Sequence, residues 1–234
     1  MRIGGFQKLT LLDYPGYLAC IVFTQGCNMR CPYCQNSQLL DFRFDSLISE
    51  DEVFEYLKKR QGILDGVVIT GGEPTVQKNL KDFIIKVKNL GFLVKLDTNG
   101  TNPALIKELI DSKLIDYIAM DIKNSFINYK LLCGIDVQID KIRKSVDLIK
   151  KSEIDHEFRT TIVKNRHDIT DIIAICKLVG TNERLYLQNF QMSDGVVDRT
   201  LESFEDSELN IIQKMLSREY PNVSIRGLKI EKER

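Results

Sequence analysis

The stretch YLACIVFTQGCNMRCPYC, residues 17–34, joins an apolar run to a loop that holds three cysteines. The run over residues 17–26 is rich in β-branched and apolar residues, which predicts a buried strand. The cysteines that follow, Cys27, Cys31 and Cys34, stand four and three residues apart. The chain therefore places candidate metal ligands directly at the carboxyl end of its first strongly apolar strand.

The same alternation of apolar strand runs and amphipathic helical stretches continues to the end of the chain. Further strands are predicted over 66–73, 92–100, 116–123, 156–164, 184–191 and 223–227. Helices are predicted over 49–58, 75–91, from Asn102 onward, and over 138–152, 168–180 and 207–220. Two helix starts carry local signals, a Ser49–Glu52 capping box and a Pro103 that follows the capping residue Asn102.

Six strand–helix units in this order predict an α/β fold with a parallel sheet and right-handed crossovers. A closed barrel of this kind needs eight units. We therefore expect an incomplete (β/α)6 TIM-like barrel that is laterally open, with a flat doubly wound sheet as the second choice. Because no linker or low-complexity tract interrupts the chain, residues 1–234 are expected to form one domain, with a cysteine loop over 24–38. The short N-terminal segment 1–16 lacks a helical period and is expected to be a surface hairpin.

Composition narrows the classes of partner and the compartment. Lys plus Arg and Asp plus Glu balance at 33 each, so bulk attraction to nucleic acid or to an anionic membrane is not expected. The apolar runs are far shorter than the roughly 20 residues that span a bilayer. The N-terminus lacks the pattern of a secretory signal. A cytoplasmic location follows as the expectation, and clustered cysteines there indicate metal ligands before disulfides.

Three clustered thiols leave two interpretations open. A zinc site needs a fourth ligand. Cys20 and Cys176 fall on apolar strand and helix patterns and are expected in the core, and Cys133 is expected in a loop. His156 and His167 have no partner at ligand spacing and are expected at the surface or at strand ends. The other interpretation is a [4Fe–4S] cluster held by three thiolates, which leaves one iron open to an outside ligand.

Polar and glycine-rich segments follow the predicted strands at their carboxyl ends. These segments are the cysteine loop, TGGEP (70–74), LDTNG (96–100), MDIK (120–123) and LQNFQ (187–191). In parallel α/β folds function gathers at this end of the sheet. We therefore expect these segments to contribute to one site. The alternative is ordinary turn chemistry: a strand-to-helix turn at TGGEP and an Asx turn at LDTNG.

The motif CNMRCPYC resembles the C-x3-C-x2-C signature of the radical S-adenosylmethionine (SAM) superfamily, and GGEP at Gly71–Pro74 resembles its second signature. From about Gly5 to Gly227 the chain resembles the glycyl-radical-enzyme activases. It is most similar to those of anaerobic ribonucleoside-triphosphate reductase, whose relatives include the pyruvate formate-lyase activating enzyme.

This resemblance implies a [4Fe–4S] cluster on Cys27, Cys31 and Cys34, with SAM bound at the open iron and cleaved to a 5′-deoxyadenosyl radical. No residue is assigned as a catalytic acid or base. The implied SAM contacts are Tyr33, Gly71, Gly72, Glu73, Asp97, Thr98, Asp121, Lys123, Arg159 and Gln188. Glu73 would accept from the SAM ammonium, and Lys123 would pair with its carboxylate or ribose. Arg159 is equally explained as a structural charge, and Phe190 is a candidate adenine contact.

The resemblance also implies a monovalent cation, with Asp97, Thr98, the carbonyl of Ala119 and Asp121 at the matching positions. Two neighbouring carboxylates need such a cation or a shifted pKa. The first functional hypothesis is an activase that forms a glycyl radical on a partner enzyme, with a flavodoxin or ferredoxin as electron donor. The rivals are a radical SAM enzyme for a small molecule and a non-catalytic zinc-binding module.

Overall fold

The structure, a computed structural model, describes residues 1–42 and 48–228. Its contacts divide the chain into two units that alternate along the sequence. The first unit comprises Met1–Arg30, Asn36–Met120 and Gln138–His156. The second comprises Cys31–Gln35, Asp121–Val137 and Glu157–Arg234. Cys27 therefore belongs to the first unit and Cys31 and Cys34 to the second, and the expectation of one domain over 1–234 stays a prediction.

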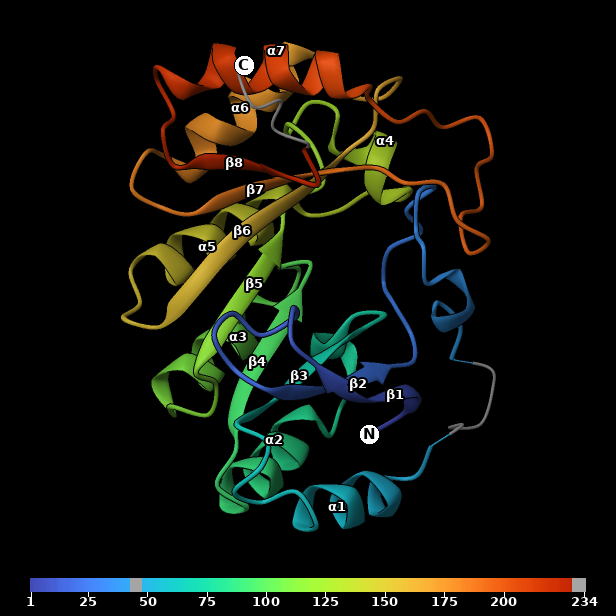
Figure 1. Ribbon diagram of the computed structural model, residues 1–234, viewed down its shortest axis with the longest axis vertical. Coiled ribbons are helices and arrows are strands. Elements are labelled where there is room, and N and C mark those ends of the chain that lie inside the picture. Colours follow the sequence, from blue (N-terminus) through green and yellow to red (C-terminus); the bar gives the residue numbers. More distant parts are fainter. Residues whose placement is uncertain (43–47, 229–234) are drawn as a thin grey trace, which may run out of the picture. The chain divides into compact units, whose positions relative to one another are not determined.

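The first unit is built on a mixed sheet. Its strands are β1 (Ile3–Thr10), β2 (Ala19–Thr24), β3 (Gly66–Gly71), β4 (Leu93–Thr98) and β5 (Tyr117–Asp121), the last residue of which falls in the second unit. β2, β3, β4 and β5 pair in parallel and lie side by side (Figure 1). The central residues of β3, Val67, Val68 and Ile69, are fully buried, as expected for a strand covered on both faces.

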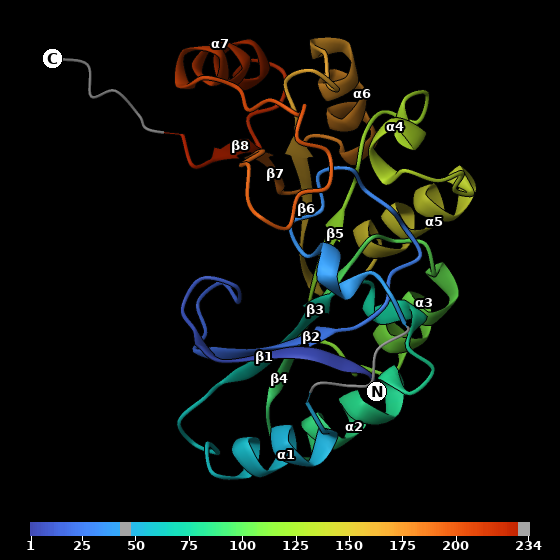
Figure 2. The ribbon, with the colours of Figure 1, turned by 90° about the vertical axis from the view of Figure 1, so that its right-hand side faces the viewer.

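The N-terminal segment forms an antiparallel hairpin with the first predicted strand. β1 pairs with β2 from Ile3↔Thr24 to Thr10↔Ala19. The turn between them stands on the side of the sheet away from α2 and α3 (Figure 2). Segment 1–16 was expected to be a surface hairpin, and instead it supplies the single strand β1, which pairs with β2 in the sheet. The sequence did not predict β1 itself as a strand of the sheet, because only the two ends of this polar, glycine-containing segment are buried.

Helices of the first unit start and end near the predicted positions. They are α1 (Glu50–Lys58), α2 (Leu80–Asn89), α3 (Pro103–Asp111) and α5 (Ile139–Lys150), with 3-10 turns at Ser37–Leu39 and Pro74–Val76. The side chains of Ser49 and Asn102 cap α1 and α3 as predicted. The predicted helix over 75–91 is wrong in its first part, because Gln77 takes an extended conformation between the 3-10 turn and α2.

The second unit has a smaller parallel sheet. Its elements are β6 (Asp155–Ile162, the first two residues of which fall in the first unit), β7 (Leu185–Asn189) and β8 (Val223–Arg226), with α4 (Tyr129–Cys133), α6 (Ile169–Val179) and α7 (Asp206–Ser217). β7 pairs in parallel with both β6 and β8. Asp168 caps α6 in a capping box with Asp171. The short helix α4 was not predicted from the sequence.

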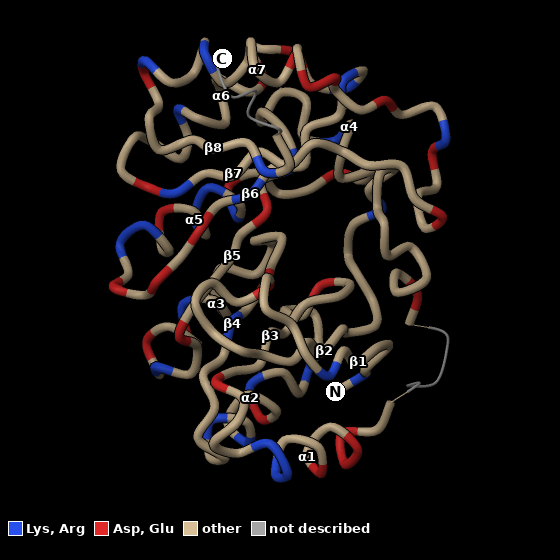
Figure 3. The backbone as a smooth tube through the Cα atoms, in the orientation of Figure 1, with Lys and Arg blue, Asp and Glu red and all other residues tan. Residues whose placement is uncertain are grey.

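Charged residues of both signs are interspersed along the backbone of each unit (Figure 3), in keeping with the balanced composition. Across residues 1–42 and 48–228, every helix falls short of the length and apolar character needed to cross a membrane.

Candidate functional site

The first unit fixes the start of the cysteine loop. The N–H of Gly26 donates to the carbonyl oxygen of Leu39 at 2.6 Å. The N–H of Cys27 donates to the carbonyl oxygen of Leu40 at 3.2 Å. Gly26 has a φ of +98°, and a Cβ at this position would come within 2.0 Å of the Phe42 ring. Any other residue would strain the backbone and collide with that ring, so glycine is required where the loop leaves β2.

In the second unit, Cys31 and Cys34 stand at the two ends of one tight turn. The N–H of Cys34 donates to the carbonyl oxygen of Cys31 at 3.1 Å, as in a β-turn. Tyr33, inside the turn, is buried in an apolar cluster with Leu132 and Phe190. The turn therefore rests on an apolar base, while the side chains of both cysteines stay half-buried.

The chain after β7 holds the same turn from another side. The N–H of Asp198 donates to the carbonyl oxygen of Pro32 at 3.1 Å. A Cβ at Gly195 would lie 1.9 Å from the carbonyl oxygen of Gln35, so only glycine allows the two segments to approach this closely. Sequence reasoning missed Gly195, because nothing local marks a glycine whose neighbour lies 160 residues earlier in the chain.

The six cysteines fall into two groups by exposure, and none forms a disulfide. Cys27, Cys31 and Cys34 are half-buried, whereas Cys20, Cys133 and Cys176 are fully buried. Burial raises the pKa of the Cys20 and Cys176 thiols to about 12. Because the thiolate is the form that binds metal, these buried cysteines are poor ligands and the predicted core role of both is confirmed.

Cys133 was expected in a loop, and this expectation is wrong. It is the last residue of α4, it is fully buried, and its thiol donates to the carbonyl oxygen of Ile135 at 3.0 Å. Burial also raises the pKa of this thiol. Cys133 therefore belongs with the core cysteines.

His167 was expected at the surface or at a strand end, and the structure buries it. Its Nδ1 accepts from the N–H of Val163 at 3.1 Å, so the ring proton lies on Nε2, which faces the carbonyl oxygen of Lys123 at 3.1 Å. Burial lowers the pKa of His167, which keeps the ring neutral. This histidine ties two backbone segments together. His156 is half-buried at the start of β6, with Nδ1 2.8 Å from the carbonyl oxygen of Ile154.

Within the described ranges 1–42 and 48–228, no three His, Cys, Asp or Glu side chains are gathered into a ready metal site. The donor chemistry of the cysteine triad nevertheless suits a thiolate-bound cluster. The three cysteines are half-buried and form no disulfide. The N–H of Met29 donates to Sγ of Cys27 at 3.3 Å, an interaction that favours a thiolate and tunes cluster potentials.

The glycines of the TGGE segment serve the packing of β3 on its neighbours. Gly71 has a φ of +113°, and a Cβ there would lie 2.4 Å from the backbone nitrogen of Thr24. A Cβ at Gly72 would lie 2.2 Å from the carbonyl oxygen of Gly26. The N–H of Glu73 also donates to this oxygen, at 2.8 Å. The TGGE segment is therefore packed against the start of the cysteine loop, and its contact with SAM stays a prediction.

The carboxylate of Glu73 lies at the centre of a buried network. Its Oε1 accepts from the N–H of Thr75 at 3.0 Å, from the Thr75 hydroxyl, and from the Thr98 hydroxyl at 2.7 Å. Its Oε2 accepts from the N–H of Asn99 at 2.7 Å. Four donors match the roughly four acceptor sites of a carboxylate. Glu73 therefore joins the TGGEP and LDTNG segments, and acceptance from the SAM ammonium stays a prediction.

Burial raises the pKa of Glu73, and the hydrogen bonds from Thr75, Asn99 and Thr98 limit the rise. All of these donors are neutral groups. The carboxyl group is therefore held by dipoles and has no cationic partner among the hydrogen bonds of this network.

Asp97 is bound by a lysine that sequence reasoning did not consider. The ammonium of Lys95 forms an ion pair with the carboxylate of Asp97 within β4. The Lys95 side chain is only 2% exposed. Asp97 stands opposite Ala119 of β5, and Thr98 is buried in the Glu73 network. The signal that could have revealed this pair is the i, i+2 spacing on a strand, which puts both side chains on one face.

Asp121, unlike Glu73, is bound by two cationic side chains. The Nε of Arg159 donates to its Oδ1 at 2.8 Å, and the ammonium of Lys123 donates to its Oδ2 at 3.1 Å. Burial disfavours the charged form of Asp121, but the two cations outweigh burial and hold its pKa well below the usual range. Burial likewise acts to lower the pKa of Lys123, yet Asp121 raises it well above its ordinary value. The structure therefore brings Asp121, Lys123 and Arg159 together.

The charged network continues through residues that the sequence did not single out. Glu157, which is 2% exposed, accepts from Arg226 at 2.8 Å and lies 4.0 Å from Arg159. The guanidinium of Arg226 stacks over the Tyr186 ring at 3.8 Å. Glu157 therefore contacts the guanidinium groups of both Arg159 and Arg226.

The two remaining sequence candidates lie on or after β7. Gln188 is half-buried and stands between Thr161 of β6 and Arg226 of β8. Phe190 is 1% exposed and packs in the apolar cluster with Tyr33, and its contact with adenine stays a prediction. Its ring is used to support the cysteine turn.

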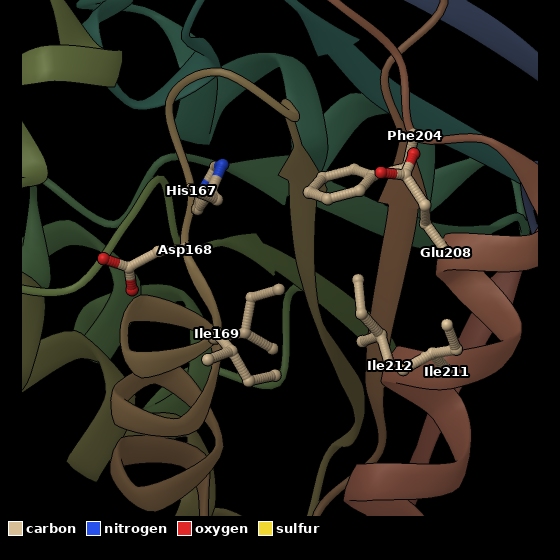
Figure 4. A pocket seen from close by; sticks show the side chains of 8 residues that line it. His167, Asp168, Ile169, Phe204, Glu208, Ile211 and Ile212 are labelled. Atoms are coloured by element: carbon tan, nitrogen blue, oxygen red, sulfur yellow. The ribbon is translucent and has the colours of Figure 1, made fainter.

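A separate cavity of about 270 Å³ opens between α6 and α7. Figure 4 shows Ile169 on one side and Ile211 and Ile212 on the other, with Phe204 at one end. His167 and Asp168 also line the cavity, and none of the predicted SAM contacts lines it. This cavity is therefore distinct from the candidate site.

Comparison with known proteins shows the family of the chain. The sequence profile described as "Radical SAM superfamily" matches residues 21–178. A protein of Methanocaldococcus jannaschii with the name "Putative glycyl-radical enzyme activating enzyme" is 37% identical over 236 residues, which cover 97% of this chain and 96% of that protein. The pyruvate formate-lyase-activating enzyme of Clostridium pasteurianum is 28% identical over 194 residues, 80% of each chain.

Among solved structures, Streptococcus suis SuiB bound to S-adenosylmethionine matches 88% of this chain with a TM-score of 0.70 and 17% sequence identity. The matched part covers 50% of SuiB, so the chain spans about half the length of that protein. At this identity the likeness shows the fold alone. It confirms the predicted fold class, the incomplete, laterally open α/β barrel, over the flat doubly wound sheet.

Proposed function

The chain belongs to the radical SAM superfamily, and from this membership we propose that it is an activase that generates a glycyl radical on a partner enzyme. The observation that carries the proposal is the match to the M. jannaschii activating enzyme, because it extends over nearly the whole of both chains. The enzyme class itself, a radical SAM enzyme, follows from the family. Membership of this family excludes the alternative of a non-catalytic zinc-binding module.

We assign Cys27, Cys31 and Cys34 as the ligands of a [4Fe–4S] cluster. Support comes from their spacing, their half-buried thiols and the exclusion of the buried cysteines from the ligand set. When bound, the cluster supplies the electron that cleaves SAM to a 5′-deoxyadenosyl radical. The chain's own part is to hold the cluster, to orient SAM and to exclude water.

Two regions of the chain are suited to hold SAM. Lys123 is a candidate partner for its carboxylate, because an ammonium has three donors and Asp121 takes one of them. Arg159 and Asp121 position this lysine. In the first unit, Glu73 fixes the backbone of the two loops that start at Gly71 and Asp97, which favours their use as backbone contacts to SAM. Tyr33, Gly72, Thr98 and Gln188 remain proposed contacts.

The finer parts of the proposal concern partners. The partner is proposed to be a glycyl radical enzyme of the anaerobic ribonucleotide reductase type, and the electron donor a flavodoxin or ferredoxin. A cytoplasmic location belongs to the same proposal, since three cluster thiols must stay reduced. A monovalent cation at Asp97 and Asp121 is the remaining cofactor expected from the sequence, and the ammonium of Lys95 competes with such a cation for Asp97.

The decisive experiment is anaerobic reconstitution with iron and sulfide, followed by reduction in the presence of SAM. We expect 5′-deoxyadenosine to form, and a glycyl radical signal in electron paramagnetic resonance only when a candidate partner enzyme is added. Cys31→Ala should lose both the iron and SAM cleavage. Cys133→Ala is the matched control and should keep both, because its thiol is buried at the end of α4.

Other outcomes would redirect the assignment. SAM cleavage without a glycyl radical on any candidate partner, but with turnover of a small molecule, would favour the small-molecule enzyme. Retention of iron and SAM cleavage by Cys31→Ala would overturn the cluster assignment.

A further inference from the structure

We propose that the ammonium of Lys95 takes the place of a monovalent cation at Asp97, so that SAM binding by this protein is independent of sodium and potassium. The proposal rests on the proposed function for its link to SAM. The contact of Lys95 with Asp97, for which a metal cation would have to compete, does not depend on that function.

Lys95 is built into the first unit as a buried charge. It lies in the middle of β4, and its side chain is only 2% exposed, beside the 13% exposed side chain of Asp97. Lysine is almost never buried to this extent unless it is paired. The spacing of two residues on one strand directs both side chains to the same face, so the pair is fixed by the strand itself.

A second contact holds the same ammonium. Tyr117 stands directly opposite Lys95 on the neighbouring strand β5, and its ring centroid lies 5.7 Å from the Lys95 ammonium. This distance is within the range of a cation–π interaction. The ammonium therefore has a carboxylate and an aromatic face as partners, which together replace the water that it loses on burial.

A metal cation at Asp97 would have to share the carboxylate with this ammonium. Two positive charges about 4 Å apart in a partly buried site repel strongly, which should weaken cation binding on the order of a hundredfold or more. The Lys95 ammonium is covalently part of the chain, so it does not exchange with the salt of the solution. Charge balance at Asp97 is thus provided by the chain.

The test compares wild type, Lys95→Met and Lys88→Met in lithium, sodium, potassium and choline chloride at one ionic strength of about 0.1 M. Lys88→Met is the matched control, because Lys88 pairs with Asp116 at 2.7 Å in the same unit and its side chain is 26% exposed, against 2% for Lys95. Thermal unfolding is measured on the protein as purified. SAM affinity is measured by calorimetry on the anaerobically reconstituted holoenzyme.

For wild type, and likewise for Lys88→Met, we expect the unfolding midpoint to be unchanged from one salt to the next. The SAM affinity of each protein should vary by no more than about 2-fold among the four salts. Lys95→Met should unfold several degrees lower in choline chloride, because Asp97 loses a buried partner. Sodium or potassium should restore part of this loss and should strengthen SAM binding by roughly 10-fold. Adding Asp97→Asn to Lys95→Met should abolish the response to cations.

A wild-type protein that needs sodium or potassium for SAM binding, or is stabilised by one of them over choline, would overturn the proposal. This arm requires no variant, so the proposal stays testable if Lys95→Met does not fold. Failure to bind SAM in every salt would count against the proposed function, and the unfolding midpoints would still decide the role of Lys95.

Discussion

Two carboxyl groups, the buried Glu73 in the first unit and the half-buried Asp121 in the second, belong to the same predicted site but are held in opposite ways. Glu73 accepts four hydrogen bonds from neutral donors, and burial raises its pKa. Asp121 is bound by Arg159 and Lys123, which outweigh burial and hold its pKa low. Both oxygens of each carboxyl group accept at least one hydrogen bond. The difference lies in whether the donors carry charge.

This contrast separates two tasks that the sequence motifs do not distinguish. Glu73 connects two loops by their backbone and threonine groups, which is the work of a positioning residue. Asp121 orients two cationic side chains, one of which has hydrogen-bond donors left for an anionic group of a ligand. A motif with one carboxylate therefore predicts a site but leaves open whether the carboxylate meets the ligand.

The largest effect on the free energy of unfolding is expected from removal of the Glu73 carboxylate from its network of neutral donors. Glu73→Ala should lower the free energy of unfolding by about 3–4 kcal/mol, because it leaves buried N–H and hydroxyl donors without an acceptor and opens a cavity. Urea unfolding at neutral pH measures this loss. Glu108→Ala, a half-exposed carboxylate that pairs with Lys81 in the same unit, is the control and should change little. A loss equal to that of the control would contradict the central position of Glu73.

Removal of the Asp121 charge should lower the free energy of unfolding somewhat less. Asp121→Asn keeps the shape but removes the charge between Lys123 and Arg159, and we expect a loss of about 2–3 kcal/mol in the free energy of unfolding. The estimate is reduced because the Asp121 side chain is 32% exposed. Asp136→Asn, whose exposed carboxylate pairs with Lys130, is the matched control. If both variants unfold at the same urea concentration, the two cations do not depend on Asp121.

The two carboxyl groups should also give opposite pH dependence. The pKa of Glu73 is raised above its ordinary 4.5, so the folded state binds more protons than the unfolded state in that window, and stability falls as pH rises from 4.5 through the raised pKa. The pKa of Asp121 is lowered below 3.8, so its contribution is present above 3.8 and is lost as pH falls below that value.

Urea unfolding from acid to neutral pH can separate these terms. Each deviation should be about 1 kcal/mol or more per unit of pKa difference. The stability of wild type relative to Glu73→Ala should fall as pH rises above 4.5, and that of wild type relative to Asp121→Asn should fall as pH drops below 3.8. Parallel curves for the three proteins would remove the distinction between the two carboxyl groups.

The smallest effect is expected at Tyr33, whose hydroxyl is buried with no hydrogen-bond partner among the described residues. Tyr33→Phe should change the free energy of unfolding by no more than about 0.5 kcal/mol, because the lost hydroxyl satisfied nothing. Tyr56→Phe is the control, since its hydroxyl donates to the carbonyl oxygen of Lys8 at 2.7 Å. A clear loss of SAM affinity in Tyr33→Phe, with unchanged stability, would assign the hydroxyl to the ligand.

Local signals predicted much of the fold. The apolar runs gave the strands, and Ser49 and Asn102 marked helix starts that the structure confirms. β1 and α4 escaped prediction, because β1 is buried only at its two ends and α4 is only five residues long. Candidate residues were chosen where the chemistry is carried by spacing. Lys95, Glu157 and Gly195 were missed, because each depends on a face or a neighbour that spacing alone does not reveal.

The sequence by itself determined the cysteine spacing, the order of strands and helices, and the segments that end the strands, since all of these are local properties. Only the tertiary structure decided what each charged side chain meets. Glu73 accepts hydrogen bonds from residues 25 and 26 positions later in the chain, and Asp121 accepts one from Arg159, 38 positions later. The physical reason is that the state of a buried charge depends on the donors and cations packed around it, and folding brings these from distant parts of the chain.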